Sequence, residues 1–293
     1  MHPLHRPVLD WYADHARELP WRGPAATPWA VMVSEFMLQQ TPVARVLPVF
    51  GAWLERWPSP GALAAAPSGE AVRAWGRLGY PRRALRLHAA ATAILERHGG
   101  EVPHSYADLI ALPGVGDYTA SAIASFAFDA RHAVLDTNVR RVFARAVGGV
   151  QFPATSLTRA ERDVAEDLLP DEAPATWAVA VMELGALVCT ATSPTCDSCP
   201  ISHLCAWNTS GRPAYDGPPR RSQSWNGTDR QARGRLLAVL RDEDGPVPRS
   251  RLDTAWSDVP QRERALASLL ADGLMVATGA ADAEDDPLFF LPT

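Results

Sequence analysis

The stretch Leu112-Pro113-Gly114-Val115-Gly116 decides the fold that this sequence predicts. It separates a segment of helical character that ends near Ala111 from another that begins near Asp117. Two glycines two positions apart at the start of a helix can expose backbone N–H groups to a phosphate, although a plain tight turn is the simpler meaning of such a pair. We therefore predict a helix, a hairpin and a helix, with Leu112, Gly114 and Gly116 as candidate contacts.

Downstream of this hairpin, all four cysteines lie within seventeen residues in the spacing C-x6-C-x2-C-x5-C: Cys189, Cys196, Cys199 and Cys205. Four thiolates from one compact loop suit a [4Fe–4S] cluster, which takes one cysteine per iron. A structural zinc site is the nearest alternative, but such sites usually contain two C-x2-C pairs, and here there is one. Two disulfides fit poorly with a cytoplasmic chain that has no other cysteine.

The first 207 residues are predicted to be helical. Periodic or alanine-rich segments, separated by Pro and Gly, cover residues 29–49, 70–77, 82–98, 106–111, 118–128, 159–169 and 175–188. We find no convincing alternating strand in this region. The sequence therefore predicts a mostly α protein.

Composition changes after residue 207. Ser, Gly, Pro and Arg dominate the next residues, so we assign a linker to residues 208–228. The remainder, residues 229–293, is predicted to contain helices over 230–241 and 260–272, a turn of helix over 250–255, and a hairpin of 274–278 with 288–291. This order suggests a small C-terminal α+β module that is winged-helix-like.

Length and composition indicate a globular protein of the cytoplasm. The 293 residues are 47% apolar, which suits two or three domains that each have a core. No apolar run reaches the ~20 residues of a membrane helix, and the N-terminus lacks the apolar core of a signal peptide. We expect a monomer without membrane association.

Positive charge is local rather than global. The formal net charge is −5, which argues against binding nucleic acid through bulk charge. Residues 71–97 nevertheless contain six arginines and one acid, and Arg140, Arg141 and Arg145 follow. All 28 basic residues are arginines, so no internal lysine amine is available as a Schiff-base nucleophile.

These features together resemble the helix-hairpin-helix DNA glycosylases, and within them the MutY adenine glycosylases. Six runs carry the resemblance in the same order: Leu19 to Arg22, Ser34 to Thr41, Gly76 to Tyr80, Leu112 to Thr119, Leu135 to Val142 and Glu183 to Cys189. The resemblance implies a six-helix barrel and an iron–sulfur cluster subdomain within residues 1–207, and binding to double-stranded DNA. It also implies base excision repair, in which adenine mispaired with 8-oxoguanine or guanine is removed.

By this resemblance, Glu35 would protonate the departing adenine and Asp136 would stabilise the positively charged sugar. Breaking an N-glycosidic bond requires a proton on a poor leaving group and a negative charge beside the developing cation. Tyr118 stands where endonuclease III relatives carry the lysine that cuts the strand, and a phenol cannot form that imine. Tyr118 and Asn138 would instead hydrogen-bond around Asp136. Without the resemblance, Asp136 would be assigned as a helix cap and Tyr118 as a packing residue.

The resemblance also implies DNA-binding residues upstream of the hairpin. Gln40 and Tyr80 correspond to residues that wedge into the base stack opposite the extruded adenine, where they compensate part of the cost of unstacking. The other candidates are expected to line the base pocket or contact the duplex: Arg22, Leu38, Thr41, Leu78, Leu112, Gly114 and Gly116. Considered singly, each would be assigned to a helix surface, a core or a turn.

Three features depart from the family. Thr137-Asn138 follows the catalytic aspartate, where relatives usually have Gly-Asn, and Val179 stands where relatives often have Gln or Glu to read the adenine edge. The Nudix-like domain that reads 8-oxoguanine in typical relatives has no counterpart in the 65 residues after the linker. Three alternatives therefore stay open: a thymine or uracil mismatch glycosylase, a catalytically idle iron–sulfur DNA-binding protein, and an abasic-site lyase, which would require strand cleavage without added alkali.

Overall fold

The computed structural model describes residues 2–217, 225–278 and 287–293, which form two compact units. Unit 1 comprises residues 1–32, 104–111 and 115–219, and unit 2 comprises residues 33–103, 112–114 and 220–293. The division passes through helix α2 (Pro28–Leu38) and through the predicted hairpin. It follows compactness rather than chain order, and the domain boundaries assigned from the sequence stay predictions.

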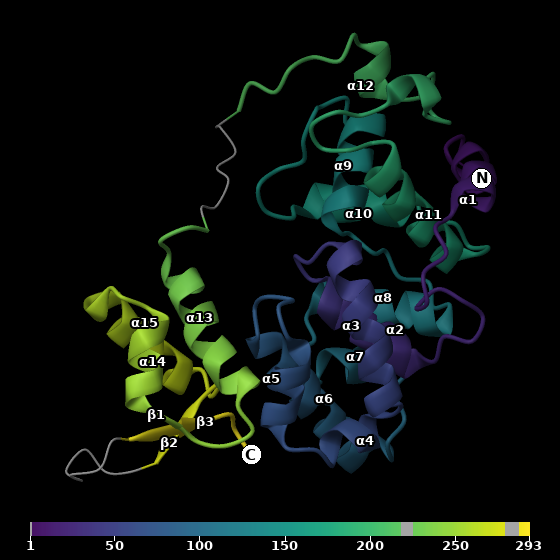
Figure 1. Cartoon of the computed structure of the whole chain (residues 1–293). Helices are drawn as coiled ribbons and strands as arrows, with labels where there is room; N and C mark the ends of the chain where they lie inside the picture. The colour runs from purple at the N-terminus through teal and green to yellow at the C-terminus, as the bar shows by residue number, and fades with distance from the viewer. Residues whose placement is uncertain (1, 218–224, 279–286) are drawn as a thin grey trace. The chain divides into compact units, whose positions relative to one another are not determined.

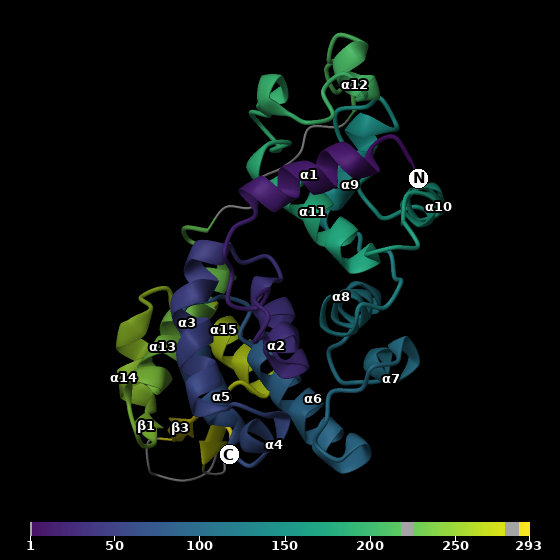
Figure 2. The same ribbon diagram turned by 90° about the vertical axis from the view of Figure 1, so that its right-hand side faces the viewer.

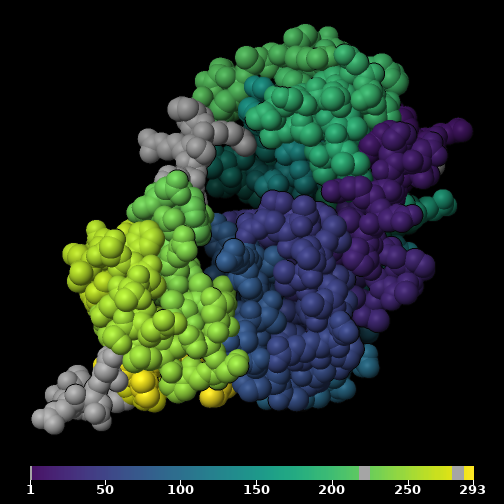
Figure 3. All heavy atoms as spheres, viewed as in Figure 1, coloured from purple at the N-terminus to yellow at the C-terminus, as the bar shows by residue number. Residues whose placement is uncertain are grey.

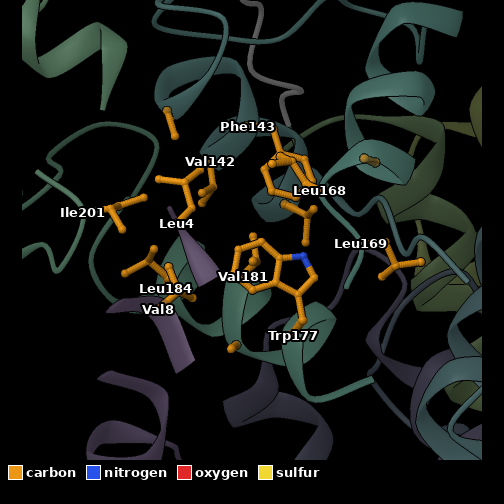
Figure 4. Close-up of a cluster of buried hydrophobic side chains, with 14 of the residues drawn as sticks. Leu4, Val8, Val142, Phe143, Leu168, Leu169, Trp177, Val181, Leu184 and Ile201 are labelled. Atoms are coloured by element: carbon orange, nitrogen blue, oxygen red, sulfur yellow. The ribbon is translucent and has the colours of Figure 1, made fainter. Parts of the chain in front are cut away.

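Unit 1 is built around helix α11 (Pro174–Leu187), which is largely apolar and is covered on several sides. Helices α1 (His5–His15) and α9 (Thr137–Ala146) pack against it, as Figure 2 shows. Figure 4 shows the core between them, where Val8, Phe143 and Trp177 are buried in one cluster. The unit also contains α7 (Tyr106–Ile110), α8 (Asp117–Phe128), α10 (Arg159–Asp167), the 3₁₀ turn η1 (Cys196–Ser198) and α12 (Ala206–Thr209).

In unit 2, an aromatic core joins α3 (Val43–Arg56) to α5 (Ser68–Trp75). The Trp53 ring lies edge-on to the rings of Trp57 and Trp75, with centroids 4.6 and 5.6 Å away, and all three indoles are buried. Such edge-to-face pairs add to the stabilisation that comes from buried area. The short helix α4 (Pro60–Ala64) packs against α6 (Arg82–His98).

The predicted helical segment 29–49 contains a break that the sequence prediction missed. Helix α2 ends at Leu38, and α3 begins at Val43. Between them, Gln40 has φ 55°, which lies outside the right-handed helical region, and Pro42 is the N-cap residue of α3. The prediction also missed α1 and the short helices α4 and α12, whereas each of the other predicted segments before residue 207 corresponds to a helix.

The C-terminal module has the predicted helices and hairpin in the predicted order, together with one short strand, Val247–Pro248, that was not predicted. It consists of α13 (Asp229–Asp242), β1 (Val247–Pro248), α14 (Arg249–Ala255), α15 (Val259–Ala271), β2 (Val276–Thr278) and β3 (Leu288–Phe290). Strand β3 lies between the other two in an antiparallel sheet, with Phe289 opposite both Val247 and Ala277. The predicted small α+β module is thus confirmed. Residues 218–224 of the predicted linker and 279–286 of the predicted hairpin lie outside the described residues.

The module packs on the earlier helices of unit 2. Figure 1 shows α13 beside α5, and in Figure 3 the green and yellow atoms of the module abut the blue atoms of those helices. Hydrogen bonds between the two helices support this arrangement, because Arg241 Nε donates to the carbonyl oxygen of Val72 at 3.0 Å. The module therefore belongs to the same compact unit as residues 33–103.

Candidate functional site

Asp136 precedes helix α9, and both of its carboxylate oxygens accept hydrogen bonds. As the N-cap residue, it accepts one from the backbone N–H of Val139 at 2.7 Å, and its other oxygen accepts one from the side-chain amide of Asn138 at 2.9 Å. Burial raises the pKa of the Asp136 carboxyl, whereas these hydrogen bonds stabilise the charged form and oppose the rise. The carboxylate is therefore held in one orientation at the start of a helix.

A chain of hydrogen bonds leads from Asp136 to the first cysteine. The Arg141 guanidinium is buried and donates to Asn138 Oδ1, to the carbonyl of Gly185 and to the carbonyl of Cys189, each at 2.7 Å. The same Asn138 donates to Asp136. The sequence prediction counted Arg141 only as local positive charge, but the structure shows it joining α9 to the end of α11.

Tyr118 packs beside the segment that leads to Asp136. Its ring lies on a small apolar cluster that includes Val134 and Ala178. It stands in the first turn of α8, whose N-cap residue is Gly116. Tyr118 is half-buried, so its ring has a packing role in unit 1.

Glu35 lies in the most buried part of α2. Its neighbours Ser34, Phe36 and Met37 are buried, and Glu35 itself is only 5% exposed. Acidic side chains are seldom this buried unless they are paired or belong to a functional site. This burial marks Glu35 as a candidate functional carboxyl group.

Gln40 and Tyr80 lie on two loops of unit 2, and both have a left-handed backbone. Their φ angles are 55° and 47°. Residues with such side chains adopt this region rarely, and the strain is tolerated only when the surrounding structure fixes it. Both side chains are exposed, which suits the predicted contact with DNA.

One arginine that the sequence prediction missed anchors both loops. Arg83 is 5% exposed, and burial lowers its pKa to about 10. Its guanidinium donates to the carbonyls of Phe36, Met37, Gln39 and Gly79 and to Thr41 Oγ1, at distances between 2.6 and 3.0 Å. The loops of Gln40 and Tyr80 therefore share this guanidinium as a point of attachment. Four of these five acceptors are backbone carbonyls, which leave no sequence signal, and this explains the omission.

Other predicted DNA contacts have buried side chains. Thr41, Leu78 and Leu112 are 5%, 3% and 3% exposed. Thr41 Oγ1 donates to the carbonyl of Leu78 at 3.1 Å, which ties the two loops together a second time. Their side chains pack inside the structure and support the loops. Only exposed side chains such as Gln40 and Tyr80, and the backbone, are accessible to a ligand there. Leu38 is half-buried at the end of α2.

The predicted hairpin lies between α7 and α8, as the sequence indicates. Gly114 has φ 76°, and a Cβ added there would lie 2.6 Å from Cβ of Arg86 on α6, so glycine is required both for conformation and for space. Gly116 has no other atom within 4 Å of an added Cβ, and it is the N-cap residue of α8. The backbone at Gly116 is therefore open to a ligand, while Gly114 shapes the turn.

Arg22, predicted to line the base pocket, is engaged in an ion pair. Its Nη1 lies 2.7 Å from Oε2 of Glu183, which is fully buried and is also bound by Arg17 at 2.6 and 2.8 Å. Burial alone would raise the pKa of Glu183, but the two guanidinium groups lower it to about 2. Val179 lies half-buried one turn earlier on α11.

The four cysteines surround one pocket in unit 1. None is in a disulfide, which disfavours the disulfide alternative, and the pocket between them is otherwise lined mainly by apolar residues such as Leu184, Val188 and Ile201. In the described part of the chain, no three His, Cys, Asp or Glu side chains converge closely enough to hold a single metal ion. Burial raises the pKa of Cys199 to about 11 and also raises the pKa of Cys205, so a bound cation would be needed to hold these two sulfurs as thiolates.

Arg145 closes this pocket. It is 1% exposed, and its Nη1 donates to Sγ of Cys189 at 3.2 Å and to the carbonyl of Thr190 at 2.8 Å. The guanidinium also lies over the ring of Trp207, 4.8 Å from the centroid. A buried cation beside a cysteine sulfur stabilises negative charge on that sulfur. Because no three of these thiols converge on one point in the described residues, the donor set fits an iron–sulfur cluster better than a single zinc ion.

The order of α7, hairpin and α8, together with an aspartate at the start of α9, defines a helix-hairpin-helix protein. Residues 33–165 match the family described as HhH-GPD superfamily base excision DNA repair protein. The chain is 54% identical to the adenine DNA glycosylase of Mycobacterium tuberculosis H37Rv over 92% of this chain and 90% of that protein. It is 40% identical to the human adenine DNA glycosylase over 68% of this chain and 38% of that protein. The chain therefore belongs to the adenine DNA glycosylase family.

Solved structures agree with this fold. A thermostable thymine-DNA glycosylase matches with a TM-score of 0.64 at 26% identity, over 70% of this chain and 94% of that one. Endonuclease III in a non-covalent complex with DNA matches with a TM-score of 0.61 at 25% identity, over the same shares. The predicted helix-hairpin-helix glycosylase fold is thus confirmed.

Proposed function

We propose that this chain removes adenine mispaired with 8-oxoguanine or guanine in duplex DNA and leaves an abasic site. The observation that carries the proposal is the fixed Asp136 carboxylate at the start of α9, in a chain of the adenine DNA glycosylase family. Glu35, nearly excluded from water on α2, supplies the second carboxyl group. Hydrolysis by these two carboxyl groups does not require an amine nucleophile.

In the proposed reaction, Glu35 gives its proton to the departing adenine as the bond between the base and C1′ of deoxyribose breaks. The electron pair of that bond leaves with the base, and positive charge develops on the sugar. The Asp136 carboxylate stabilises this charge. Water then adds to C1′ and loses a proton to the Glu35 carboxylate, which restores the acid, and the products are free adenine and an abasic site.

The chain is proposed to be monofunctional, without strand cleavage. Cleavage by the imine route requires a primary amine that attacks C1′, and the sequence contains no lysine. Tyr118 stands at the start of α8, where a phenol packs but cannot form an imine. We therefore assign Tyr118 and Asn138 to the support of Asp136.

Contact with DNA is proposed to involve the hairpin and the two loops that Arg83 anchors. Gly116 at the N-terminus of α8 leaves its backbone accessible to a phosphate, and Gln40 and Tyr80 supply exposed side chains for insertion into the base stack. By the resemblance to the family, Arg22, Leu38 and Thr41 remain candidates for the base pocket.

The pocket of cysteines is proposed to bind a [4Fe–4S] cluster through Cys189, Cys196, Cys199 and Cys205. When bound, the cluster would join the cysteine loop to α11 and α9, without a part in hydrolysis. Its support is the apolar pocket, the four unpaired thiols and the buried guanidinium of Arg145. Visible absorbance with four iron and four sulfide ions per chain is expected, whereas colourless zinc-loaded protein would overturn the assignment.

None of the helices in the described ranges is long and apolar enough to cross a membrane. We propose that the protein acts as a monomer on DNA in the cytoplasm. Size-exclusion chromatography with light scattering should give a mass near 31.7 kDa.

The decisive experiment uses duplexes with adenine opposite 8-oxoguanine, adenine opposite guanine, and thymine or uracil opposite guanine. Under single-turnover conditions, adenine is expected to be released first, with strand breaks only after alkali. Faster release of thymine or uracil would favour a mismatch glycosylase. This alternative is tested because Val179 is apolar, where relatives often have Gln or Glu to read the adenine edge. Binding without release of any base would mark a catalytically idle protein.

Glu35→Gln should abolish release of adenine and leave binding to the duplex intact, because the amide keeps the shape but cannot give up the proton. Glu55→Gln, an exposed change on α3, is the matched control and should retain full activity. Activity that persisted in Glu35→Gln would remove Glu35 from its proposed role.

A further inference from the structure

The C-terminal module is fixed to α5 by a reciprocal pair of arginines. Arg241 near the end of α13 donates to the carbonyl of Val72, and Arg73 donates to the carbonyls of Leu240 and Arg241. Burial lowers the pKa of Arg241 to about 10, so this guanidinium lies inside the contact rather than at its edge. Guanidinium groups at the free carbonyls of a helix C-terminus also complement its dipole.

Two further contacts hold the module in the same orientation. The backbone N–H of Gly69 donates to the carbonyl of Pro292 at 2.6 Å, and a Cβ at Gly69 would lie 2.7 Å from that of Leu291. At the other end, Arg82 lies 3.3 Å from Asp272 at the end of α15. The module is therefore attached along the whole length of α5 and the loop that follows it.

This attachment brings the start of α13 to Tyr80. The Arg230 guanidinium lies 5.6 Å from the centroid of the Tyr80 ring, and its Nη1 is 3.4 Å from the phenol oxygen. The same guanidinium lies 5.9 Å from the ring centroid of Trp225. Tyr80 is 42% exposed and Trp225 is 50% exposed, so the three side chains form a surface of two accessible aromatic rings around one cation.

We propose that Arg230 is a positioning residue that holds the Tyr80 side chain for insertion into duplex DNA, so that the C-terminal module sharpens the discrimination of the base opposite the excised adenine. This inference rests on the proposed function, because it presumes that Tyr80 enters the base stack. Arg230 acts through Tyr80 and touches no reacting atom.

The physical basis is preorganisation. An exposed tyrosine on a loop loses rotamer freedom when it inserts between bases, and this loss weakens binding. A guanidinium over the ring and beside the phenol oxygen restricts the ring before DNA arrives. The Tyr80 backbone is already fixed through Arg83, which donates to the adjacent carbonyl of Gly79. Arg230 fixes the side chain in turn, and its charge favours an approaching phosphate strand.

The test is a double-mutant cycle between Arg230→Gln and Tyr80→Ala, measured as the ratio of single-turnover rates for adenine opposite 8-oxoguanine and opposite guanine. Arg230→Gln alone should reduce this ratio about fivefold, the size that one exposed cation–π contact supports. In the Tyr80→Ala background, the same change should have no further effect. Arg230→Lys should restore part of the ratio, because it keeps a cation and an N–H donor.

A second readout reports on insertion itself. In Glu35→Gln protein, a fluorescent 2-aminopurine beside the mispair should show a smaller change on binding when Arg230→Gln is added. Arg235→Gln removes an equal charge from an exposed position of the same helix and should leave both readouts unchanged. An equal effect of Arg235→Gln, or an effect of Arg230→Gln that persists without Tyr80, would overturn the inference.

The two levels of the proposal fail in different ways. If the unaltered protein releases no adenine from either duplex, the proposed function fails. If it releases adenine with a preference for 8-oxoguanine that Arg230→Gln leaves unchanged, the function stands and the inference fails.

Discussion

At the scale of single residues, Asp136 combines two roles that the sequence presents as alternatives. One carboxylate oxygen caps α9 through Val139, and the other is held by Asn138. Capping and the proposed electrostatic role therefore use the same group without conflict. The cap orients the carboxylate, since a helix N-terminus fixes the rotamer that accepts its N–H groups.

The pH dependence of base release follows from the pKa of Asp136. The proposed role requires the ionised form, so the rate should fall as the pH drops through the pKa of this group. Because burial raises that pKa, the acid limb should lie above that of an ordinary aspartate. Asn138→Ala should move the limb to still higher pH, because it removes a hydrogen bond to the charged form. Single-turnover rates across pH test this, with Thr137→Ala, at an exposed neighbouring position, as the control.

Glu183 makes a prediction about stability. Its carboxylate pairs with Arg17 and Arg22, and its pKa in the folded protein, about 2, lies below the ordinary value of 4.5. The contribution of the ionised Glu183 carboxylate to the free energy of unfolding is fully present above pH 4.5 and is lost as the pH falls toward 2. Glu183→Gln should lower the free energy of unfolding at pH 7 by about 3 kcal/mol, because two guanidinium groups lose their partner.

Urea unfolding at pH 7 and pH 3 measures this effect. The difference between Glu183→Gln and the unaltered protein should shrink at pH 3. Glu96→Gln, at an exposed position near the end of α6, should change little at either pH. An equal loss in both variants would contradict the assigned role of the buried carboxylate.

The structural roles of the buried arginines could not be predicted from the sequence. An arginine-rich stretch predicts a phosphate-binding surface, whereas Arg83 and Arg141 point inward and bind carbonyl oxygens. A guanidinium has five donors and can satisfy carbonyls at helix ends and in loops that come together only in the fold. Partners such as Phe36 of Arg83 and Cys189 of Arg141 are more than 40 residues away in the sequence, so no local pattern marks these arginines.

At the scale of elements, the crossing of α9 and α11 determines where Asn138 lies. A Cβ on Gly185 would lie 2.7 Å from Cβ of Asn138 and 3.0 Å from its carbonyl oxygen. The two helices can approach this closely only because residue 185 has no side chain. The orientation of Asp136 thus depends on a residue of a different helix.

Gly185→Ala should therefore displace Asn138 and slow base release roughly 10- to 100-fold, since small misplacements of a catalytic group are costly. Single-turnover rates at a fixed temperature measure the loss. Gly51→Ala, in α3 where an added Cβ meets no atom within 4 Å, should leave the rate unchanged and stabilise the helix slightly. A normal rate in Gly185→Ala would show that the crossing tolerates a methyl group.

Most helices were predictable from periodicity, and the exceptions have local causes. Residues 29–49 are mostly apolar on both sides of the turn that divides α2 from α3, so the segment was predicted as one helical stretch. Gln40 adopts positive φ there although it is not a residue that favours turns. Tertiary hydrogen bonds from Arg83 hold that turn, and they are not visible in sequence.

At the scale of the whole molecule, the C-terminal module was predictable in its elements but not in its attachment. The helices and hairpin follow from pattern, and the three-stranded sheet agrees with them. The contact between Arg230 and Tyr80 joins residues 150 positions apart. Such pairing depends on complementary surfaces of two folded parts, which composition does not encode.

The attachment predicts a change in unfolding. Arg241→Met removes the buried guanidinium from Val72 and should weaken docking by about 1–3 kcal/mol. The thermal transition should then broaden or split, with the module unfolding first. Calorimetry measures this, and Arg264→Met is the control because its ion pair with Asp229 is exposed. A single unchanged transition would show that the remaining contacts suffice.

The single guanidinium of Arg83 has a consequence for any future mutational survey of these loops. The loops of Gln40 and Tyr80 both accept hydrogen bonds from the Arg83 side chain. Disorder in one loop should therefore loosen Arg83 and weaken its hydrogen bonds to the other loop, so that the two loops become ordered or disordered cooperatively. Substitutions at Gln40 and Tyr80 should consequently be non-additive although the side chains need not touch. A scan of single changes would then understate how strongly the pair is linked.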